Sequence, residues 1–249
     1  MLTVLAVVLT FVSGGVDVTI FARLGNVFAS VMTGNIVVFG LSLARGSLSL
    51  GLHTGAAVWG YVAGVAVGTR LGAYRAREDR RVAGSDWPPR VTWLLLAELA
   101  LLAGFMAGWE AVGSHPAGAA QIVMLVVAAC AMGIQSAAVV RLDLGSVSTT
   151  YLTGTLTGLV GSLVQGDRQS RGAAGFRRPA VLLGLLAGAT LAGLLIAYAA
   201  AIAPVPPLLA VALGAGLTSG RLLWGVHGKR ASPDRAGGAR KATPEYLRD

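Results

Sequence analysis

The sequence predicts an all-α integral membrane protein, and three observations support this fold class. Of its 249 residues, 55% are hydrophobic and 12% are charged, which is about half the charged fraction of a soluble domain. Most of the chain divides into apolar stretches of the ~20 residues that a helix needs to cross a bilayer. The net charge of +9 comes from arginines and lysines in three short segments beside these stretches. Such clustering is typical of cytoplasmic loops, so we do not expect nucleic-acid binding.

Six stretches predict full transmembrane helices: 1–22, 51–74, 91–109, 119–140, 179–202 and 208–226. Two further segments, 26–44 and 147–164, are shorter or rich in threonine and glycine. We predict that each of these is a re-entrant or broken helix. No basic region precedes the first stretch, so we expect a retained span rather than a signal peptide.

The basic loops decide how the two weak segments are treated. Arginine-rich loops at 75–90 and 167–178 face the same side if the chain crosses the membrane twice between them. The prediction is therefore six full spans with both termini cytoplasmic, and eight full spans are the alternative. The transmembrane domain covers 1–228, and a basic, disordered cytoplasmic tail covers 229–249.

A polar motif occurs twice in the apolar background, about 120 residues apart. Gly15-x-Asp17 aligns with Gly133-x-Gln135, Arg23 with Arg141, and Thr33-Gly34-Asn35 with Thr153-Gly154-Thr155 after a two-residue slip. With three full crossings in each half (about 1–112 and 119–226), the second half enters from the opposite face. The sequence therefore predicts an inverted 3+3 repeat, an architecture of many transporters.

These motifs also carry a family resemblance. Met32-Thr33-Gly34-Asn35 after the first span, followed by Thr150-Tyr151-x-Thr153-Gly154-Thr155 in the second half, resembles the YoaK-like family of bacterial membrane proteins, domain of unknown function 1275. The resemblance covers about residues 5–226. It implies a multi-pass protein of the bacterial inner membrane and leaves the function open.

Polar groups within membrane spans are costly, and they usually mark a pathway or a site. The candidate substrate or ion pathway consists of Asp17, Arg23, Asn26, Thr33, Gly34, Asn35, Glu98, Gln135, Arg141, Tyr151, Thr153, Gly154 and Thr155. Asp17 and Glu98 are either proton-coupling groups or packing carboxylates with a local partner. Arg23 and Arg141 either snorkel to the interface, which we favour, or anchor an anionic solute. The hydroxyl and amide side chains either satisfy freed backbone groups or line a constriction.

Four glycines at four-residue spacing, Gly60, Gly64, Gly68 and Gly72, form a stripe that lets another helix approach closely. The sequence does not distinguish packing within the chain from a contact between two copies. We therefore expect the lipid bilayer, a small solute and, through this stripe, a homo-oligomer as partners.

We expect a small-solute transporter coupled to protons through Asp17 or Glu98. A passive channel on the same hairpin pair and a non-transporting membrane scaffold are the alternatives. We do not expect an enzyme, because the sequence offers no nucleophile–base pair. It offers no metal or cofactor site either, because Cys130 is the single cysteine and the three histidines are scattered.

Overall fold

The computed structural model describes residues 2–79, 89–142, 152–165 and 173–230. Apart from short turns, these residues are helical, and they contain no strand. The helices are α1 (Leu2–Arg23), α2 (Met32–Arg45), α3 (Leu48–Asp79), α4 (Pro89–Ala111), α5 (Gly118–Arg141), α6 (Leu152–Val164), α7 (Ala173–Tyr198) and α8 (Val205–Arg230), with the short 3-10 helix η2 (Ala200–Ile202) before α8. Tyr151, the 80–88 part of the first basic loop and the tail from 231 lie outside the described residues.

Six of the described helices are long and apolar enough to cross a membrane. They are α1, α3, α4, α5, α7 and α8, the last together with η2. α2 has 14 residues and α6 has 13, which at 1.5 Å per residue is too short for the ~30 Å hydrocarbon core. The predicted all-α fold with six helices able to span a membrane is confirmed within the described residues. The two segments predicted as re-entrant or broken are the short helices α2 and α6.

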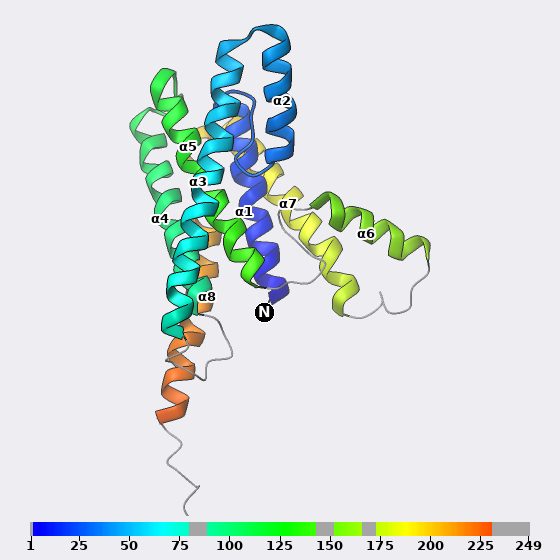
Figure 1. Ribbon diagram of the computed structural model, residues 1–249, viewed down its shortest axis with the longest axis vertical. Helices are drawn as coiled ribbons and strands as arrows, with labels where there is room; N and C mark the ends of the chain where they lie inside the picture. Colours follow the sequence, from blue (N-terminus) through cyan, green and yellow to red (C-terminus); the bar gives the residue numbers. More distant parts are fainter. Residues whose placement is uncertain (1, 80–88, 143–151, 166–172, 231–249) are drawn as a thin grey trace, which may run out of the picture.

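The chain re-enters the bundle between α1 and α2. After Arg23 it turns back alongside α1, so that Ala29 and Ser30 hydrogen-bond to Asp17, six residues before the end of that helix. α2 then runs outward again, and a turn at Gly46, whose φ of +62° is in the left-handed region, leads into α3 (Figure 1). Segment 24–45 is therefore a hairpin that approaches and leaves from one end of the bundle.

α1 and α5 are the central helices of the bundle. In each, 67% of the spanning residues are buried, compared with 22% in α3 and in α7. α1 packs along α7, α5 packs along α3, and α4 and α8 complete the bundle against the central pair. The starts of α1, α4 and α7 and the ends of α3, α5 and α8 lie at one end of the bundle (Figure 1). We call this the N-terminal end.

The glycine stripe of α3 packs within the chain. A Cβ atom on Gly64 would collide with the carbonyl oxygen of Cys130 on α5, and one on Gly60 would lie 2.9 Å from that of Val126. Gly68 and Gly72 face Ala137 and Arg141 of the same helix. The stripe is thus the surface on which α5 lies close to α3. The homo-oligomer stays a prediction, and its contact surface would have to lie elsewhere.

The α1–α7 contact repeats the α3–α5 contact residue by residue. On α7, Gly184 faces the Val7 carbonyl and Gly188 faces the Phe11 carbonyl. A shift of 119 residues relates Val7 to Val126 and Phe11 to Cys130, and a shift of 124 residues relates Gly60 to Gly184 and Gly64 to Gly188.

The 119-residue shift also relates Gly14 of α1 to Gly133 of α5. Gly14 faces the backbone of α7, and Gly133 faces the backbone of α3. The sequence alignment instead matched Gly15 to Gly133, because Gly14 and Gly15 are adjacent and equally good matches. In the contact register, Asp17 corresponds to Ser136 rather than Gln135, and Arg23 to Leu142 rather than Arg141.

We expect Gly64→Ala to destabilise the protein by about 1–3 kcal/mol, because the new methyl group meets backbone atoms that cannot rotate away. Gly104→Ala on α4 is the matched control, since a Cβ there has nothing within 4 Å. Thermal unfolding in detergent measures both variants. Equal melting temperatures would contradict the close α3–α5 packing.

α2 and α6 are the two peripheral helices. α2 packs against α3, and α6 packs against α7. They lie apart, α2 beside the bundle and α6 projecting away from it (Figure 1). They do not face each other across the centre of the bundle, as the hypothesis of two meeting hairpins had anticipated.

Candidate functional site

Asp17 holds the re-entrant hairpin in place. Its side chain is 6% exposed. Oδ1 accepts hydrogen bonds from the backbone N–H groups of Ala29 (2.7 Å) and Ser30 (2.8 Å), and Oδ2 accepts one from the Ser30 hydroxyl (2.5 Å). Three donors thus satisfy the carboxylate and fix the segment of the hairpin that returns alongside α1. This geometry favours the packing interpretation of Asp17.

Asn35 holds the same hairpin from the other side. Its Oδ1 accepts from the Phe28 N–H (2.9 Å) and its Nδ2 donates to the Phe28 carbonyl (2.7 Å). Asn35 is fully buried, whereas Thr33 is exposed. Asn26 adopts a φ of +56° in the turn, a conformation that asparagine tolerates better than most residues. The motif residues of the first half therefore shape the hairpin.

The two motif arginines each bind a backbone carbonyl of a neighbouring helix. Arg23 Nη2 donates to Ile196 on α7 at 3.4 Å, and Arg141 Nη2 donates to Thr69 on α3 at 2.8 Å. Each arginine ends its own helix, so it ties that end to the helix alongside. These contacts favour the structural interpretation of both side chains.

Gln135 joins the two central helices. Its Oε1 accepts from the Ser13 hydroxyl at 2.8 Å, and its Nε2 donates to the Leu9 carbonyl at 3.1 Å. Both Ser13 and Gln135 are buried. Sequence reasoning missed Ser13, although a serine in the middle of an apolar span was a usable signal.

Glu98 differs from all of these residues. It is fully buried in α4, and neither of its carboxyl oxygens has a hydrogen-bond partner within the described residues. It lies at the centre of the inward face of α4, one turn from Leu94 and Leu102. Leu94 packs against Ile134 of α5, and Leu102 belongs to the main core. An acid is thus enclosed among hydrophobic side chains in the middle of a spanning helix.

The second-half motif lies on α6. Thr155 is 1% exposed and its hydroxyl has no hydrogen-bond partner within the described residues, whereas Thr153 and Gly154 are exposed. α6 is tied to α7 by a hydrogen bond from Arg178 Nη1 to the Gly158 carbonyl (2.7 Å). The predicted pathway residues therefore separate into the first hairpin, the α1–α5 contact, Glu98 and α6.

Comparison with known proteins supplies the family. Residues 5–217 match the family described as "Protein of unknown function (DUF1275)". The chain belongs to the DUF1275 family. It is 30% identical over 152 residues to the UPF0700 transmembrane protein YoaK of Bacillus subtilis strain 168, an alignment that covers 61% of this chain and 63% of that relative. No solved structure matches the chain significantly.

Two of the cavities within the described residues of this DUF1275 member bear on the site. One, of about 10 Å³, lies near α1, α4 and the start of α8 and is lined by Val16, Thr19, Leu102, Phe105, Pro204 and Pro207. Its volume is about that of one water probe. Because Leu102 lines it, this space lies one helical turn from Glu98. We call it the α4 cavity.

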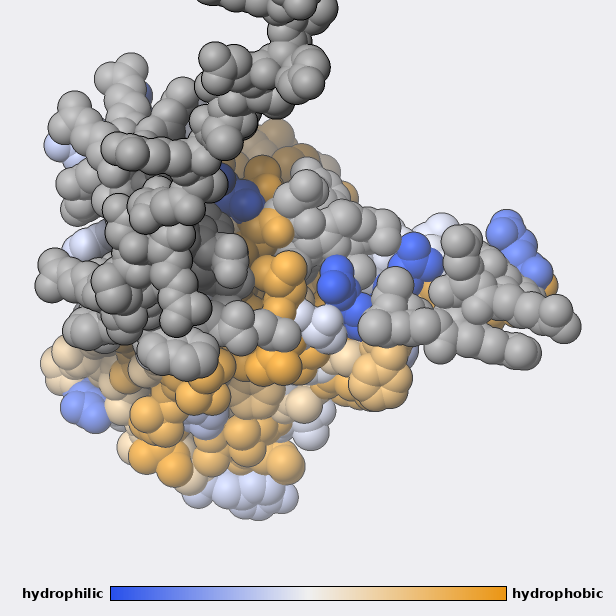
Figure 2. Space-filling model, turned by 90° about the horizontal axis from the view of Figure 1, so that it is seen from below, coloured by the Kyte–Doolittle hydropathy of each residue, from blue (hydrophilic) through white to orange (hydrophobic). Residues whose placement is uncertain are grey.

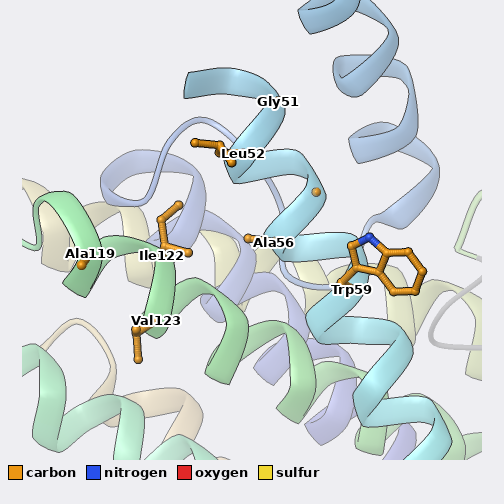
Figure 3. A pocket seen from close by; sticks show the side chains of 8 residues that line it. Gly51, Leu52, Ala56, Trp59, Ala119, Ile122 and Val123 are labelled. Atoms are coloured by element: carbon orange, nitrogen blue, oxygen red, sulfur yellow. The ribbon is translucent and has the colours of Figure 1, made fainter. Parts of the chain in front are cut away.

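The other is a groove of about 610 Å³ between α3 and α5. Apolar residues and glycines line it, and Trp59 lies at its edge (Figure 3). None of the predicted pathway residues contributes to it. No group of three metal-binding side chains occurs within the described part of the chain.

Proposed function

We propose that this protein transports a small solute across the bacterial inner membrane and that Glu98 carries the coupled proton. The observation that carries the proposal is the burial of Glu98 without a hydrogen-bond partner among the described residues. Asp17, the other acid considered, already has three donors. The proton-coupling role therefore falls to Glu98.

The physical argument rests on cost. A buried polar group without a partner costs about 1–3 kcal/mol, and more when it is charged. Ionisable groups within membrane spans usually serve ion or substrate pathways. In this enclosed position, burying Glu98 costs the least free energy when its carboxyl group is protonated and uncharged. It can exchange that proton only when water reaches it, and the α4 cavity is an internal space one helical turn away.

In an alternating-access mechanism, Glu98 is exposed to water on one side of the membrane at a time. The internal repeat supports such a mechanism. The matched glycine contacts of α1–α7 and α3–α5 support two halves with the same internal packing. α1 and α5 start at opposite ends of the bundle (Figure 1), which supports an inverted relation between the halves. In inverted repeats, transport follows from rocking one half against the other around a central site. We propose that both termini face the cytoplasm, on the side of the arginine-rich loops.

The proposal is tested in proteoliposomes with an internal pH-sensitive dye and an inward proton gradient. Separate pools of amino acids, organic acids, sugars and nucleosides are added outside. We expect at least one pool to accelerate proton entry, and Glu98→Gln to reduce that response at least tenfold. Solute uptake that does not depend on the gradient would indicate a passive channel instead. No response to any pool would contradict transport of these solute classes.

One observation favours a non-transporting scaffold as the second candidate. α2 and α6 lie apart (Figure 1), so the two short helices do not enclose a shared polar cavity at the centre of the bundle. A scaffold needs no proton exchange at Glu98. Under this alternative, wild type and Glu98→Gln give the same proton flux with every pool.

A further inference from the structure

Two arginines lie at the N-terminal end of the bundle, on the packed helices α4 and α5. Arg90 lies in the first turn of α4, and Arg141 is the last residue of α5. α4 and α5 pack along each other, and Val91 and Leu142, the residues next to these arginines, belong to one hydrophobic cluster. The two positive charges are therefore held at the same place in the bundle and repel. Arg141 donates to the carbonyls of Ala137 (3.0 Å) and Thr69 (2.8 Å). These acceptors carry no net charge, so neither of them neutralises the positive charge of Arg141.

Arg90 is less satisfied than Arg141. Its Nε atom is buried and has no hydrogen-bond partner within the described residues. Within the described residues, the hydrogen-bond acceptors of Arg141 are backbone carbonyls, and no carboxylate is bound to Arg90 Nε. A buried donor without an acceptor is costly, and so are two like charges at close range. Among the residues that the structure describes, the two arginines therefore have no anionic partner.

The position of the pair indicates where that anion comes from. Trp93, one turn after Arg90, is 48% exposed, and Tyr74, two residues after the Gly72 that faces Arg141, is 71% exposed. Tryptophan and tyrosine gather at the level of lipid headgroups. Seen from this end, hydrophilic residues lie in small groups among hydrophobic ones (Figure 2). The two guanidiniums are thus at headgroup depth beside a hydrophobic surface.

We propose that Arg90 and Arg141 bind the phosphate of an anionic phospholipid headgroup. Guanidinium groups bind phosphate oxygens through paired, charge-assisted hydrogen bonds. Basic pockets between transmembrane helices are known sites for anionic headgroups. The positive end of the α4 helix dipole adds to the attraction. The site joins α4 to α5 and, through Thr69, to α3, and it is independent of the proposed transport.

Titration calorimetry on the detergent-solubilised full chain tests this site. The three probes are short-chain phosphatidylglycerol, short-chain phosphatidylcholine and inorganic phosphate. We expect phosphatidylglycerol to bind at least tenfold more tightly than the other two. Arg90→Gln should weaken its binding about tenfold or more, the loss of one charge-assisted contact. Arg90→Lys should give an intermediate affinity, because lysine keeps the positive charge but cannot form the two parallel hydrogen bonds of a guanidinium.

Arg45→Gln is the matched control, because this exposed arginine ends α2 at the opposite end of the bundle (Figure 1). Its binding of phosphatidylglycerol should equal that of wild type. Equal affinity in Arg90→Gln would overturn the site. Inorganic phosphate binding as tightly as phosphatidylglycerol would overturn the lipid assignment, and equal losses in Arg45→Gln would reduce it to general charge attraction.

Discussion

Glu98→Met is expected to make the protein more stable and to abolish proton-coupled uptake. Methionine fills a similar volume, and its apolar side chain packs well against Leu94, Leu102 and the other apolar side chains around position 98. It also removes two buried oxygens that have no hydrogen-bond partner in the part of the chain that the structure describes. Relief of that cost should stabilise the protein by about 1–3 kcal/mol, which for a chain of this size raises the melting temperature by roughly 2–4 °C per kcal/mol. Thermal unfolding and the proteoliposome assay measure the two effects.

Opposite changes in stability and activity are expected where a destabilising group is kept for function. Leu94→Met, one turn away on the same face and outside the lining of the α4 cavity, is the control, and it should keep uptake with little change in stability. If Glu98→Met lowers the melting temperature, Glu98 stabilises the fold and our account of it is wrong.

Asp17→Ala is expected to release the hairpin between α1 and α2. The substitution removes three hydrogen bonds, two of them from backbone N–H groups of Ala29 and Ser30. Ala29 is fully buried, so water does not readily replace the lost acceptor. We expect a loss of about 3 kcal/mol or more and faster proteolysis within 24–31. Thermal unfolding and limited proteolysis measure this.

Asp17→Asn distinguishes the hairpin contact from proton coupling. The asparagine Oδ1 can still accept both backbone N–H groups, and its Nδ2 can donate to the Ser30 hydroxyl, which rotates to accept. We therefore expect near-normal stability and retained proton-coupled uptake. A stable Asp17→Asn protein without uptake would move the coupling role from Glu98 to Asp17.

Much of the fold follows from the sequence because the bilayer imposes simple rules. Length and apolar content identified the six spanning helices, and the charge of the arginine loops separated them from the short segments 26–44 and 147–164. The positions of α2 and α6 did not follow. Motif similarity shows that two segments correspond but does not show what each one packs against. The register was also one residue off, since only the backbone contacts distinguish Gly14 from Gly15.

The candidate residues were found more readily than their roles. Asp17 and Asn35 stood out as polar groups in apolar sequence. Apart from the Ser30 hydroxyl, the partners described above are backbone groups of residues 28–30, and backbone groups carry no sequence pattern. Glu98 stood out for the same reason. Its lack of a partner is a property of the surrounding helices, and no spacing within α4 could reveal it.

Access of water to position 98 tests the central claim most directly. In a Cys130→Ala background, Glu98→Cys is treated in proteoliposomes with a membrane-impermeant thiol reagent, added outside or enclosed inside. Ala57→Cys, also fully buried, is the control and should stay unlabelled. We predict that Glu98→Cys is labelled from each side in turn, as expected for a group exposed alternately to the two compartments. Absence of labelling from both sides would contradict a role for Glu98 in transport.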